Sequence, residues 1–363
     1  MNTHFSLSPE ELRTAVQKLD ALASAMNQVL FGKEDLIELI LTGVLARGHI
    51  LLEGLPGLGK TELVKGLSKA LDITARRVQF TPDLLPGDIT GTPVLQETDG
   101  RKSFVFQEGP VFANIMLADE INRASPKTQS ALLEAMQERK VTVMGQSHSL
   151  PEPFFVLATQ NPIELEGTYP LPEAQLDRFL FKINVGRNPA EVLTRIVLNR
   201  EMGVEPAVPH VLDAEELLRL MELARRIAIP DAVAGYIGRL VNATHPGESE
   251  AARGVKYGAS PRAALGLAAA AKARALRQGR PFCSFEDVQA VIRPVLEHRI
   301  LLDLMAKLEG ATPGDVVERL LKEIPAQDKP LPHSLAAAKI HKSHHLYKQV
   351  TTVAERPWKA LRH

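Results

Sequence analysis

The 363-residue sequence contains little of three features that would narrow its class. It has one cysteine, Cys283, which excludes a disulfide framework or a Cys-based metal site and favours a reducing, cytoplasmic setting. Aromatic residues make up only 5%, so we expect a mostly aliphatic core. Lys+Arg and Asp+Glu each number 43, and the formal net charge is zero. The strongest global argument for binding nucleic acid or a membrane surface is therefore missing.

The sequence also lacks a long uninterrupted apolar run. The most apolar stretch, around residues 36–55, is broken by Glu38, Arg47 and His49, so we expect no membrane span. The N-terminal segment shows neither the compact apolar stretch nor the cleavage site of a signal peptide. Apolar residues make up 45% and charged residues 24%, which is ordinary for a globular protein with one larger and one smaller domain.

The chain divides into four predicted regions. Residues 1–30 form an N-terminal helix, for which Ser8, Pro9 and Glu11 supply a capping box with proline at the first position. Residues 31–188 alternate apolar strands with helices, which predicts an αβα core built on a parallel sheet. Residues 189–325 predict an all-α lid domain, and residues 326–363 a tail of uncertain order. The fold class is therefore α/β, followed by a helical domain.

The predicted strands of the core are bounded by turn signals. They are His49–Glu53, Arg76–Phe80, Ile115–Asp119, Phe154–Thr159 and Phe181–Val185. The first, third and fourth are continuous apolar runs, as expected of strands buried on both faces. Two β-hairpins, Thr92–Phe106 and Val141–Leu150, are predicted as insertions. They are either surface decoration or loops that face a ring pore or a partner.

Beyond Val185 only helices are predicted. They are Asp213–Ala228, Asp231–His245, Ser260–Arg277, Ser284–His298 and Thr312–Ile324, and each begins with a residue able to cap. The tail contains His341, His344 and His345. A metal site there is conceivable, but no carboxylate or cysteine accompanies the histidines, so a solvated tail is the favoured interpretation.

One motif predicts a phosphate-binding loop. Residues Gly54–Thr61 match G-x-x-x-x-G-K-[ST], after an apolar strand and before a helix. The glycines let backbone N–H groups surround phosphate oxygens at the helix N-terminus. Lys60 would reach the β- and γ-phosphates, and Thr61 would hold Mg²⁺. The predicted nucleotide-binding residues of this segment are Gly54, Pro56, Gly57, Leu58, Gly59, Lys60, Thr61 and Glu62.

Two further strands end in polar residues. The apolar run from Ile115 ends in Asp119 and Glu120. In an open α/β sheet, carboxylates at such a strand end lie beside the phosphate loop. Asp119 suits Mg²⁺, usually through water, and Glu120 could orient the attacking water. Asn161 follows the next strand and could hydrogen-bond that water or the γ-phosphate, although Asn-Pro also simply begins a turn.

Four longer segments of the sequence resemble a known protein family. Gln79–Gly91, Leu117–Ala124, Ala158–Glu164 and Glu166–Ala174 closely resemble the MoxR family of AAA+ ATPases. The resemblance extends over about residues 28–325, and the tail has no counterpart in it. It implies the Walker A pair at Lys60 and Thr61 and the Walker B pair at Asp119 and Glu120.

The resemblance also assigns residues outside these two motifs. It implies sensor 1 at Asn161, an arginine finger at Arg178 that acts on the neighbouring subunit's ATP, and sensor 2 at Arg262, in the lid over the phosphates. Phe31 and Gly32 lie where the family contacts adenine. The predicted catalytic residues are thus Glu120, Asn161, Arg178 and Arg262. Arg123 is either a second contact across the interface or a plain surface arginine.

The resemblance implies an ATPase that uses ATP and Mg²⁺ and works as a homo-oligomeric, hexameric ring. Members of the family are chaperone-like, remodel protein complexes and often act with a partner carrying a von Willebrand factor A domain. A nucleic-acid motor is disfavoured by the zero net charge and by the lack of an appended nucleic-acid-binding module. A chelatase-like subunit for metal insertion cannot be separated by sequence. A scaffold without turnover is disfavoured, because every hydrolytic position is filled.

Overall fold

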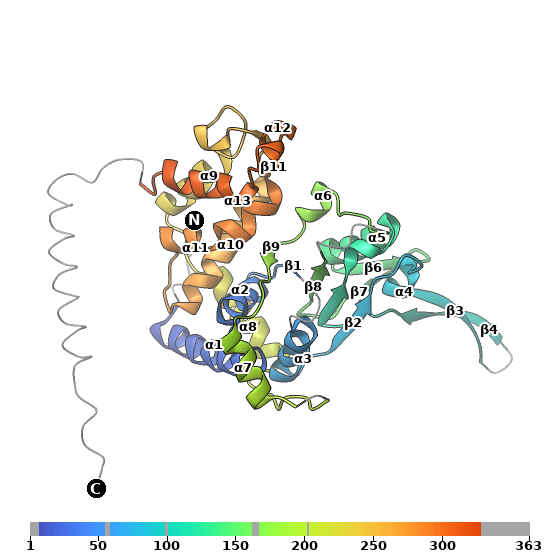
Figure 1. The fold of residues 1–363 in the computed structure, drawn as a ribbon. Coiled ribbons are helices and arrows are strands. Elements are labelled where there is room, and N and C mark those ends of the chain that lie inside the picture. Colours follow the sequence, from blue (N-terminus) through green and yellow to red (C-terminus); the bar gives the residue numbers. More distant parts are fainter. Residues whose placement is uncertain (1–6, 55–58, 99–100, 162–166, 202, 328–363) are drawn as a thin grey trace, which may run out of the picture. The chain divides into compact units, whose positions relative to one another are not determined.

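The computed structural model describes residues 7–54, 59–98, 101–161, 167–201 and 203–327. Residues up to Ile324 form one compact unit, shown in Figure 1. The predicted boundary at residue 188 lies inside this unit and stays a prediction. The expectations for the tail and its histidines fall on residues 328–363, outside the described residues.

A five-stranded parallel sheet forms the centre of the core. Its order is β2-β5-β8-β1-β9, and all four pairings are parallel. The strands are β1 Ile50–Glu53, β2 Ala75–Gln79, β5 Ile115–Asp119, β8 Phe155–Gln160 and β9 Phe181–Asn184. The α/β prediction is confirmed, and each strand lies within one residue of its predicted bounds. The central β1, β5 and β8 are buried except at their last residues, as the apolar runs indicate.

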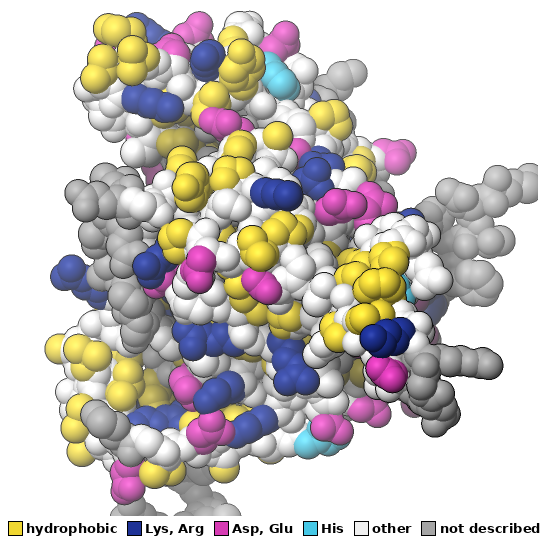
Figure 2. Space-filling model, turned by 90° about the vertical axis from the view of Figure 1, so that its right-hand side faces the viewer, with side chains coloured by type: hydrophobic (Ala, Val, Ile, Leu, Met, Phe, Trp, Pro, Cys, Tyr) yellow, Lys and Arg dark blue, Asp and Glu magenta, His cyan; other side chains and the backbone are white. Residues whose placement is uncertain are grey.

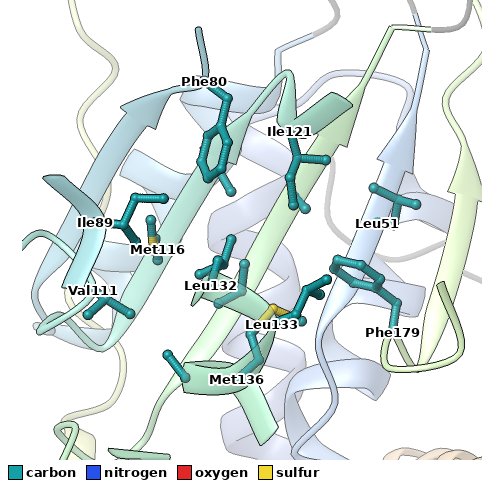
Figure 3. Packing of buried hydrophobic residues seen from close by; sticks show 14 of the residues in the cluster. Leu51, Phe80, Ile89, Val111, Met116, Ile121, Leu132, Leu133, Met136 and Phe179 are labelled. Atoms are coloured by element: carbon teal, nitrogen blue, oxygen red, sulfur yellow. The ribbon is translucent and has the colours of Figure 1, made fainter. Parts of the chain in front are cut away.

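Helices cover both faces of the sheet. On one face Leu51, Met116 and Val156 belong to a buried apolar cluster with Leu132 and Met136. The two last residues come from α5 (Pro126–Glu138), which Figure 3 shows against the strands. Because successive side chains on a strand alternate between faces, the neighbours of these strand residues point to the opposite face. That face is covered by α2 (Glu34–Leu45), whose Gly43 lies against Ile50 and Phe181, and by α3 (Lys60–Leu71).

The N-terminal helix links the core to the helical region. α1 (Pro9–Val29) begins with the predicted capping box, since Glu11 N donates to Ser8 Oγ at 3.1 Å and Ser8 N to Glu11 Oε2 at 2.8 Å. It packs against α2, α3 and the lid helix α10 (Pro261–Arg277). Arg277 of α10, with a side chain only 7% exposed, pairs with Glu38 of α2 and Asp20 of α1. The helices around α10 are thereby joined to those that cover the sheet.

Both predicted hairpins are present. β3 (Gly91–Thr98) pairs with β4 (Arg101–Glu108), and β6 (Lys140–Val143) with β7 (Gln146–Ser149), both antiparallel. The ring of Phe106 on β4 stacks on that of His148 on β7, with centroids 4.2 Å apart. The two insertions therefore contact each other. Figure 2 looks from the side to which β3–β4 projects and shows hydrophobic side chains in patches between Lys and Arg.

The region after β9 is mainly helical, as predicted. It contains α7 Ala190–Asn199, α8 Ala214–Arg226, α9 Asp231–Asn242, α10 Pro261–Arg277, α11 Phe285–Leu296, α12 Leu304–Leu308 and α13 Pro313–Glu323, with 3₁₀ turns at Glu250–Ala252 and Glu297–Arg299. α10 is central and contacts α8, α9 and α11. Its buried alanines allow close approach. The core adds α4 Pro86–Thr90, α6 Glu173–Leu176 and a 3₁₀ turn at Ile121–Arg123.

Several details of the helical region differ from expectation, among them the helices α7 and α12, which were not predicted. It also contains a short antiparallel pair, β10 (Val255–Tyr257) and β11 (Leu301–Leu302), which is too short for its alternation to be visible in the sequence. Asp213, Ser284 and Thr312 cap their helices as predicted. Asp231 instead lies inside α9 behind Pro230, and Ser260, although at the N-cap position of α10, makes no side-chain hydrogen bond to the helix. Among the described residues, no helix is long and apolar enough to cross a membrane.

Candidate functional site

The phosphate loop lies where β1 ends and α3 begins. Pro56, Gly57 and Leu58 fall outside the described residues. Gly59 is the N-cap of α3 and has φ +83°, in the left-handed region that glycine tolerates. A Cβ there would also lie 2.7 Å from Leu30 Cδ2. The backbone conformation therefore favours glycine at this position, and a larger residue would also have to displace the end of the Leu30 side chain.

Lys60 opens α3 and turns back over the loop. Its Nζ donates to the carbonyl of Gly54 at 2.8 Å. Burial lowers the pKa of Lys60, and the charges of Asp119 and Glu120 oppose that shift. The ammonium is thus drawn out of water towards the two carboxylates. Additional negative charge bound beside it would favour its protonated form.

A hollow of about 380 Å³ lies at the carboxyl ends of the strands. Its lining residues are Gly54, Gly59, Lys60, Thr61, Glu62, Arg77, Gln79, Asp119, Glu120, Thr159 and Asn161. The structure thus brings together residues predicted from three separate motifs, which follow β1, β5 and β8. Parallel strands explain this convergence, because their carboxyl ends meet at one edge of the sheet. Arg77, Gln79 and Thr159 were not predicted to belong here.

Asp119, at the end of β5, is held by both neighbouring strands. Thr159 Oγ1 on β8 donates to Asp119 Oδ1 at 2.6 Å. The guanidinium of Arg77 on β2 donates to Oδ2 from two nitrogens, at 2.6 and 3.1 Å. Arg77 is half exposed, so this ion pair is open to exchange with another cation. The one sequence signal for Arg77 is its place two residues before the end of an edge strand.

Glu120 occupies a strained backbone position. Its φ is +57°, which costs a non-glycine residue roughly 1–2 kcal/mol. Its carboxylate accepts hydrogen bonds from Gln79 Nε2 at 2.7 Å and from Arg123 at 2.9 Å. Thr159 Oγ1 accepts from the backbone N–H of Glu120 at 2.8 Å. The side chain is therefore aimed by groups from three elements, and Arg123 contacts its own chain's Glu120 in this structure.

A second hollow of about 490 Å³ adjoins the first, and the two share Gly59 and Glu62. Phe31 also lines it, together with Ile196 and Arg200 of the segment around α7. The guanidinium of Arg200 lies 5.4 Å from the centroid of the Phe31 ring, a cation–π distance. A cavity with an aromatic wall beside the phosphate loop is suited to a nucleobase.

Gly32, the other predicted base contact, faces α7. Its φ is +66°, and a Cβ there would lie 2.3 Å from Val192 of that helix. Any side chain at this position would push α7 away from the core. Gly32 therefore permits the close packing of α7 beside the second hollow, while Phe31 lies on the hollow itself.

The two arginines predicted to be catalytic, Arg178 and Arg262, lie at the end of the sheet where the parallel strands begin. Arg178 precedes β9, whose first residue Phe181 pairs with Ile50, the first residue of β1. The phosphate loop follows the last residue of β1, so Arg178 and the loop lie at opposite ends of the parallel strands. The loop is at the carboxyl edge of the sheet, where the strands end, and Arg178 is at the amino edge, where they begin. Figure 1 shows α6, just before Arg178, and α7 beyond opposite ends of β9. Arg178 donates to the carbonyl of Leu133 at 3.1 Å.

Arg262 lies beside Arg178 and away from its own phosphate loop. Its guanidinium donates to Asp177 Oδ2 at 3.2 Å. Within the described part of the chain, neither Arg178 nor Arg262 is among the residues that line the two hollows. The structure places Arg262 in the lid but not over its own chain's phosphate loop, and its assignment as sensor 2 stays a prediction. The Asp177 carboxylate, fixed by the buried Arg299, attracts it to the opposite edge.

A parallel sheet with a phosphate loop and a helical lid defines the class of AAA ATPases, and comparisons with known proteins agree. Residues 49–181 match the model of the ATPase family associated with various cellular activities (AAA), and residues 247–320 that of the AAA lid domain. The Chaperone MoxR1 of Mycobacterium tuberculosis is 45% identical over 320 residues, which are 87% of this chain and 84% of that protein.

Two further relatives extend the comparison. The uncharacterized protein YeaC of Bacillus subtilis is 42% identical over 300 residues, covering 82% of this chain and 92% of that protein. A crystal structure from Cytophaga hutchinsonii, of a protein classed as an ATPase, is 40% identical with a TM-score of 0.81, and covers 87% of this chain and 97% of that one. The chain belongs to the MoxR family of AAA+ ATPases.

Proposed function

We propose that the protein hydrolyses ATP as a chaperone-like ring, with each ATP bound between two subunits. One observation carries this proposal. Lys60, Asp119 and Glu120 lie at the carboxyl edge of the sheet, whereas Arg178 and Arg262 lie at the amino edge. A head-to-tail contact between copies brings one subunit's carboxyl edge against the next one's amino edge, and a closing rotation makes a ring.

The residues at the carboxyl edge fit Mg²⁺ and ATP. The N-terminus of α3, entered through Gly59, presents backbone N–H groups that lack helical partners and suit phosphate oxygens. The hydroxyl of Thr61 and the carboxylate of Asp119 line the same hollow and are oxygen ligands of the type Mg²⁺ prefers. When bound, the metal ion neutralises charge that develops on the phosphates. We propose that Arg77 withdraws from Asp119 on binding.

The side chains around the carboxylate pair have distinct proposed roles. Lys60 places its charge at the β- and γ-phosphates. Glu120, aimed by Gln79 and Arg123, accepts a hydrogen bond from the attacking water and orients it. Asn161, 93% buried at the end of β8, is proposed to bind the same water or the γ-phosphate. The second hollow, beside Phe31, receives the base.

Arg178 and Arg262 are proposed to act on the ATP of the neighbouring subunit. Four residues of β9 separate the two edges, roughly 13 Å at the usual rise of a strand, and Arg178 lies three residues further back. A lone chain therefore cannot bring Arg178 to its own phosphates. Cationic groups supplied by a second subunit raise NTPase rates by about 10³–10⁵, so hydrolysis is proposed to depend on assembly.

The inserted hairpins are proposed to contact a protein client. Leu95 and Phe104 are cross-strand partners on β3–β4 and are 53% and 63% exposed. Met144, near the tip of β6–β7, is 68% exposed. Exposed apolar groups of this kind mark interaction surfaces. The relative named Chaperone MoxR1 supports a chaperone role, and a partner with a von Willebrand factor A domain remains part of the proposal.

The direct test is ATP hydrolysis measured over a range of protein concentrations. Specific activity is expected to rise steeply and then reach a plateau as rings form, in parallel with the mass measured by light scattering. If specific activity is flat across concentrations at which the mass shows monomers, the shared site is wrong. Addition of DNA would separate the alternative of a nucleic-acid motor, since stimulation that falls steeply with salt is expected only for such a motor.

A further inference from the structure

We propose that Asp177 is a positioning residue that retains Arg262 at the amino edge until ATP in the neighbouring subunit draws it away. The proposal rests on the proposed function, because it concerns the same shared site. It assigns to Asp177 a part in setting the affinity for ATP, although Asp177 itself contacts neither hollow in the described structure. The observation behind it is a single carboxylate shared by three donors.

The three donors all come from the helical region. Ser260 Oγ, at the N-cap position of α10, donates to both carboxylate oxygens of Asp177, at 3.0 and 3.2 Å. Arg262, two residues further along, donates at 3.2 Å. Arg299, which ends the 3₁₀ turn after α11, donates through Nε at 2.7 Å. Asp177 therefore joins the segment that carries Arg178 to the lid.

Arg299 and Arg262 are held very differently. The side chain of Arg299 is 3% exposed and also donates to the carbonyls of Asp177 and Phe179, at 3.0 and 2.6 Å. The side chain of Arg262 is 49% exposed, with one hydrogen bond to Asp177 at 3.2 Å. Arg299 is a fixed part of the structure, whereas Arg262 can exchange its partner at little cost.

This asymmetry has a functional consequence. A terminal phosphate offers a guanidinium paired, charge-assisted hydrogen bonds, which are stronger than the single long bond to Asp177. When Arg262 leaves for such a phosphate, Asp177 keeps Arg299 and Ser260 as partners. The turn that carries Arg178 then stays in place. Asp177 therefore competes with the neighbour's ATP for Arg262 without disturbing Arg178.

The test is a double-mutant cycle on the full-length protein, assembled at saturating concentration. KM for ATP and kcat are measured for wild type, Asp177→Asn, Arg262→Ala and the double variant. Asp177→Asn is expected to lower KM about two- to fivefold, the range for an exposed ion pair, with kcat within twofold. In the Arg262→Ala background the same change should leave KM unaltered. A purely structural role of Asp177 would raise KM or lower kcat in both backgrounds.

Ser260→Ala supplies a second variant in case Asp177→Asn does not fold. The hydroxyl of Ser260 does not cap α10, so its removal leaves that helix intact. Without this donor, the Asp177 carboxylate attracts Arg262 more strongly, and KM is expected to rise about twofold. An unchanged or lowered KM in Ser260→Ala, or an equal shift of KM in both backgrounds of the cycle, overturns the proposal.

Failure of this inference can be told from failure of the proposed function. If wild-type activity rises with assembly but the cycle shows no coupling, the retention of Arg262 by Asp177 is wrong and the shared site stands. If wild-type activity is independent of assembly, both are wrong, because there is then no neighbouring ATP to attract Arg262.

Discussion

The two edges of one parallel sheet are built in contrasting ways. At the carboxyl edge, polar residues follow β1, β5 and β8 within contiguous motifs and line a common hollow. At the amino edge, Asp177, Arg262 and Arg299 come from segments far apart in the sequence and meet at one carboxylate. The first edge can be recognised from local sequence, whereas the second exists only once the lid is folded against the core.

Each edge contains an exposed ion pair that can exchange its partner. Asp119 and Glu120 at the carboxyl edge are paired with arginines that are half exposed, Arg77 at 50% and Arg123 at 41%. The amino edge offers Arg178 and Arg262. Opposite charges across a contact favour the correct docking orientation over wrong ones. The comparison therefore supports the proposal of two half-sites that complete each other between subunits, which the following changes test.

The largest expected loss of ATPase activity comes from a substitution at the amino edge. Arg178→Ala should lower kcat by about 10³–10⁵, as loss of a trans-acting arginine does in NTPases, while ATP binding at the intact carboxyl edge persists. Steady-state ATPase assays and nucleotide-binding fluorescence measure the two quantities. Arg219→Ala, an exposed arginine on α8, is the matched control and should behave as wild type. A loss of less than threefold in Arg178→Ala would show that Arg178 takes no part in catalysis.

The next largest expected loss of ATPase activity comes from a substitution at the carboxyl edge. Glu120→Gln removes the charge that orients the attacking water and should lower kcat about 10²–10⁴-fold, with ATP retained on the protein. Chromatography of the variant incubated with ATP, followed by analysis of the bound nucleotide, checks this. Glu222→Gln, the same change on an exposed part of α8, should have no effect. Normal turnover by Glu120→Gln would remove Glu120 from the mechanism.

Stability measurements separate the fixed and exchangeable arginines of the amino edge. Arg299→Ala removes a buried guanidinium that donates to the Asp177 carboxylate and to the carbonyls of Asp177 and Phe179. It should lower the free energy of unfolding by about 3–5 kcal/mol. Arg262→Ala removes an exposed ion pair and should cost at most about 1 kcal/mol. Urea unfolding followed by circular dichroism compares them, and equal losses would contradict the assignment of Arg299 as the fixed partner.

A smaller effect is expected from pH, which changes the stability of the fold through two buried histidines near the amino edge. His49 precedes β1, and burial lowers its pKa to about 4. His298, which bonds the carbonyl of Phe179, has its pKa lowered by burial and by Arg299. Both are neutral in the folded protein and bind protons on unfolding below about pH 6.5. Their contribution to stability is therefore complete above pH 6.5 and is lost as the pH falls towards 4.

The expected slope follows from proton linkage. Between pH 6 and pH 5 the free energy of unfolding should fall by about 1 kcal/mol for each histidine, approaching the limit of about 1.4 kcal/mol per pH unit for one proton. In His49→Gln the slope should be smaller by one proton, whatever the variant's absolute stability. Urea unfolding at several pH values measures it. A slope unchanged in His49→Gln would show that this histidine does not titrate on unfolding.

The sequence predicts most of the core and less of the site. The strands are found because apolar runs lie between clear turn signals, and the hairpins because Asp99-Gly100 and Gly145 mark their turns. Arg77 and Gln79 are missed as partners of the carboxylates. Their positions matter only because β2 lies next to β5 in the sheet. The order of strands in a sheet cannot be predicted from local periodicity.

The sequence also does not predict where the helical lid lies relative to the sheet. The motif around Arg262 identifies the residue but gives no information about which edge of the sheet it faces. That depends on how α10 packs against α1, α2 and α11, and on the anchoring of Asp177 by Arg299. Tertiary packing alone decides this, so the sequence could not say whether Arg262 faces the phosphates of its own chain or those of another.

The most direct test of the account is to mix two inactive variants. Arg178→Ala retains an intact carboxyl edge, and Glu120→Gln retains an intact amino edge. In a mixed ring, the carboxyl edge of the first meets the amino edge of the second and forms a whole site. The account predicts that each variant alone is inactive and that the mixture regains ATPase activity, with a maximum near equal amounts. A mixture as inactive as its components, under conditions where mixed rings are shown to form, would contradict a site shared between subunits.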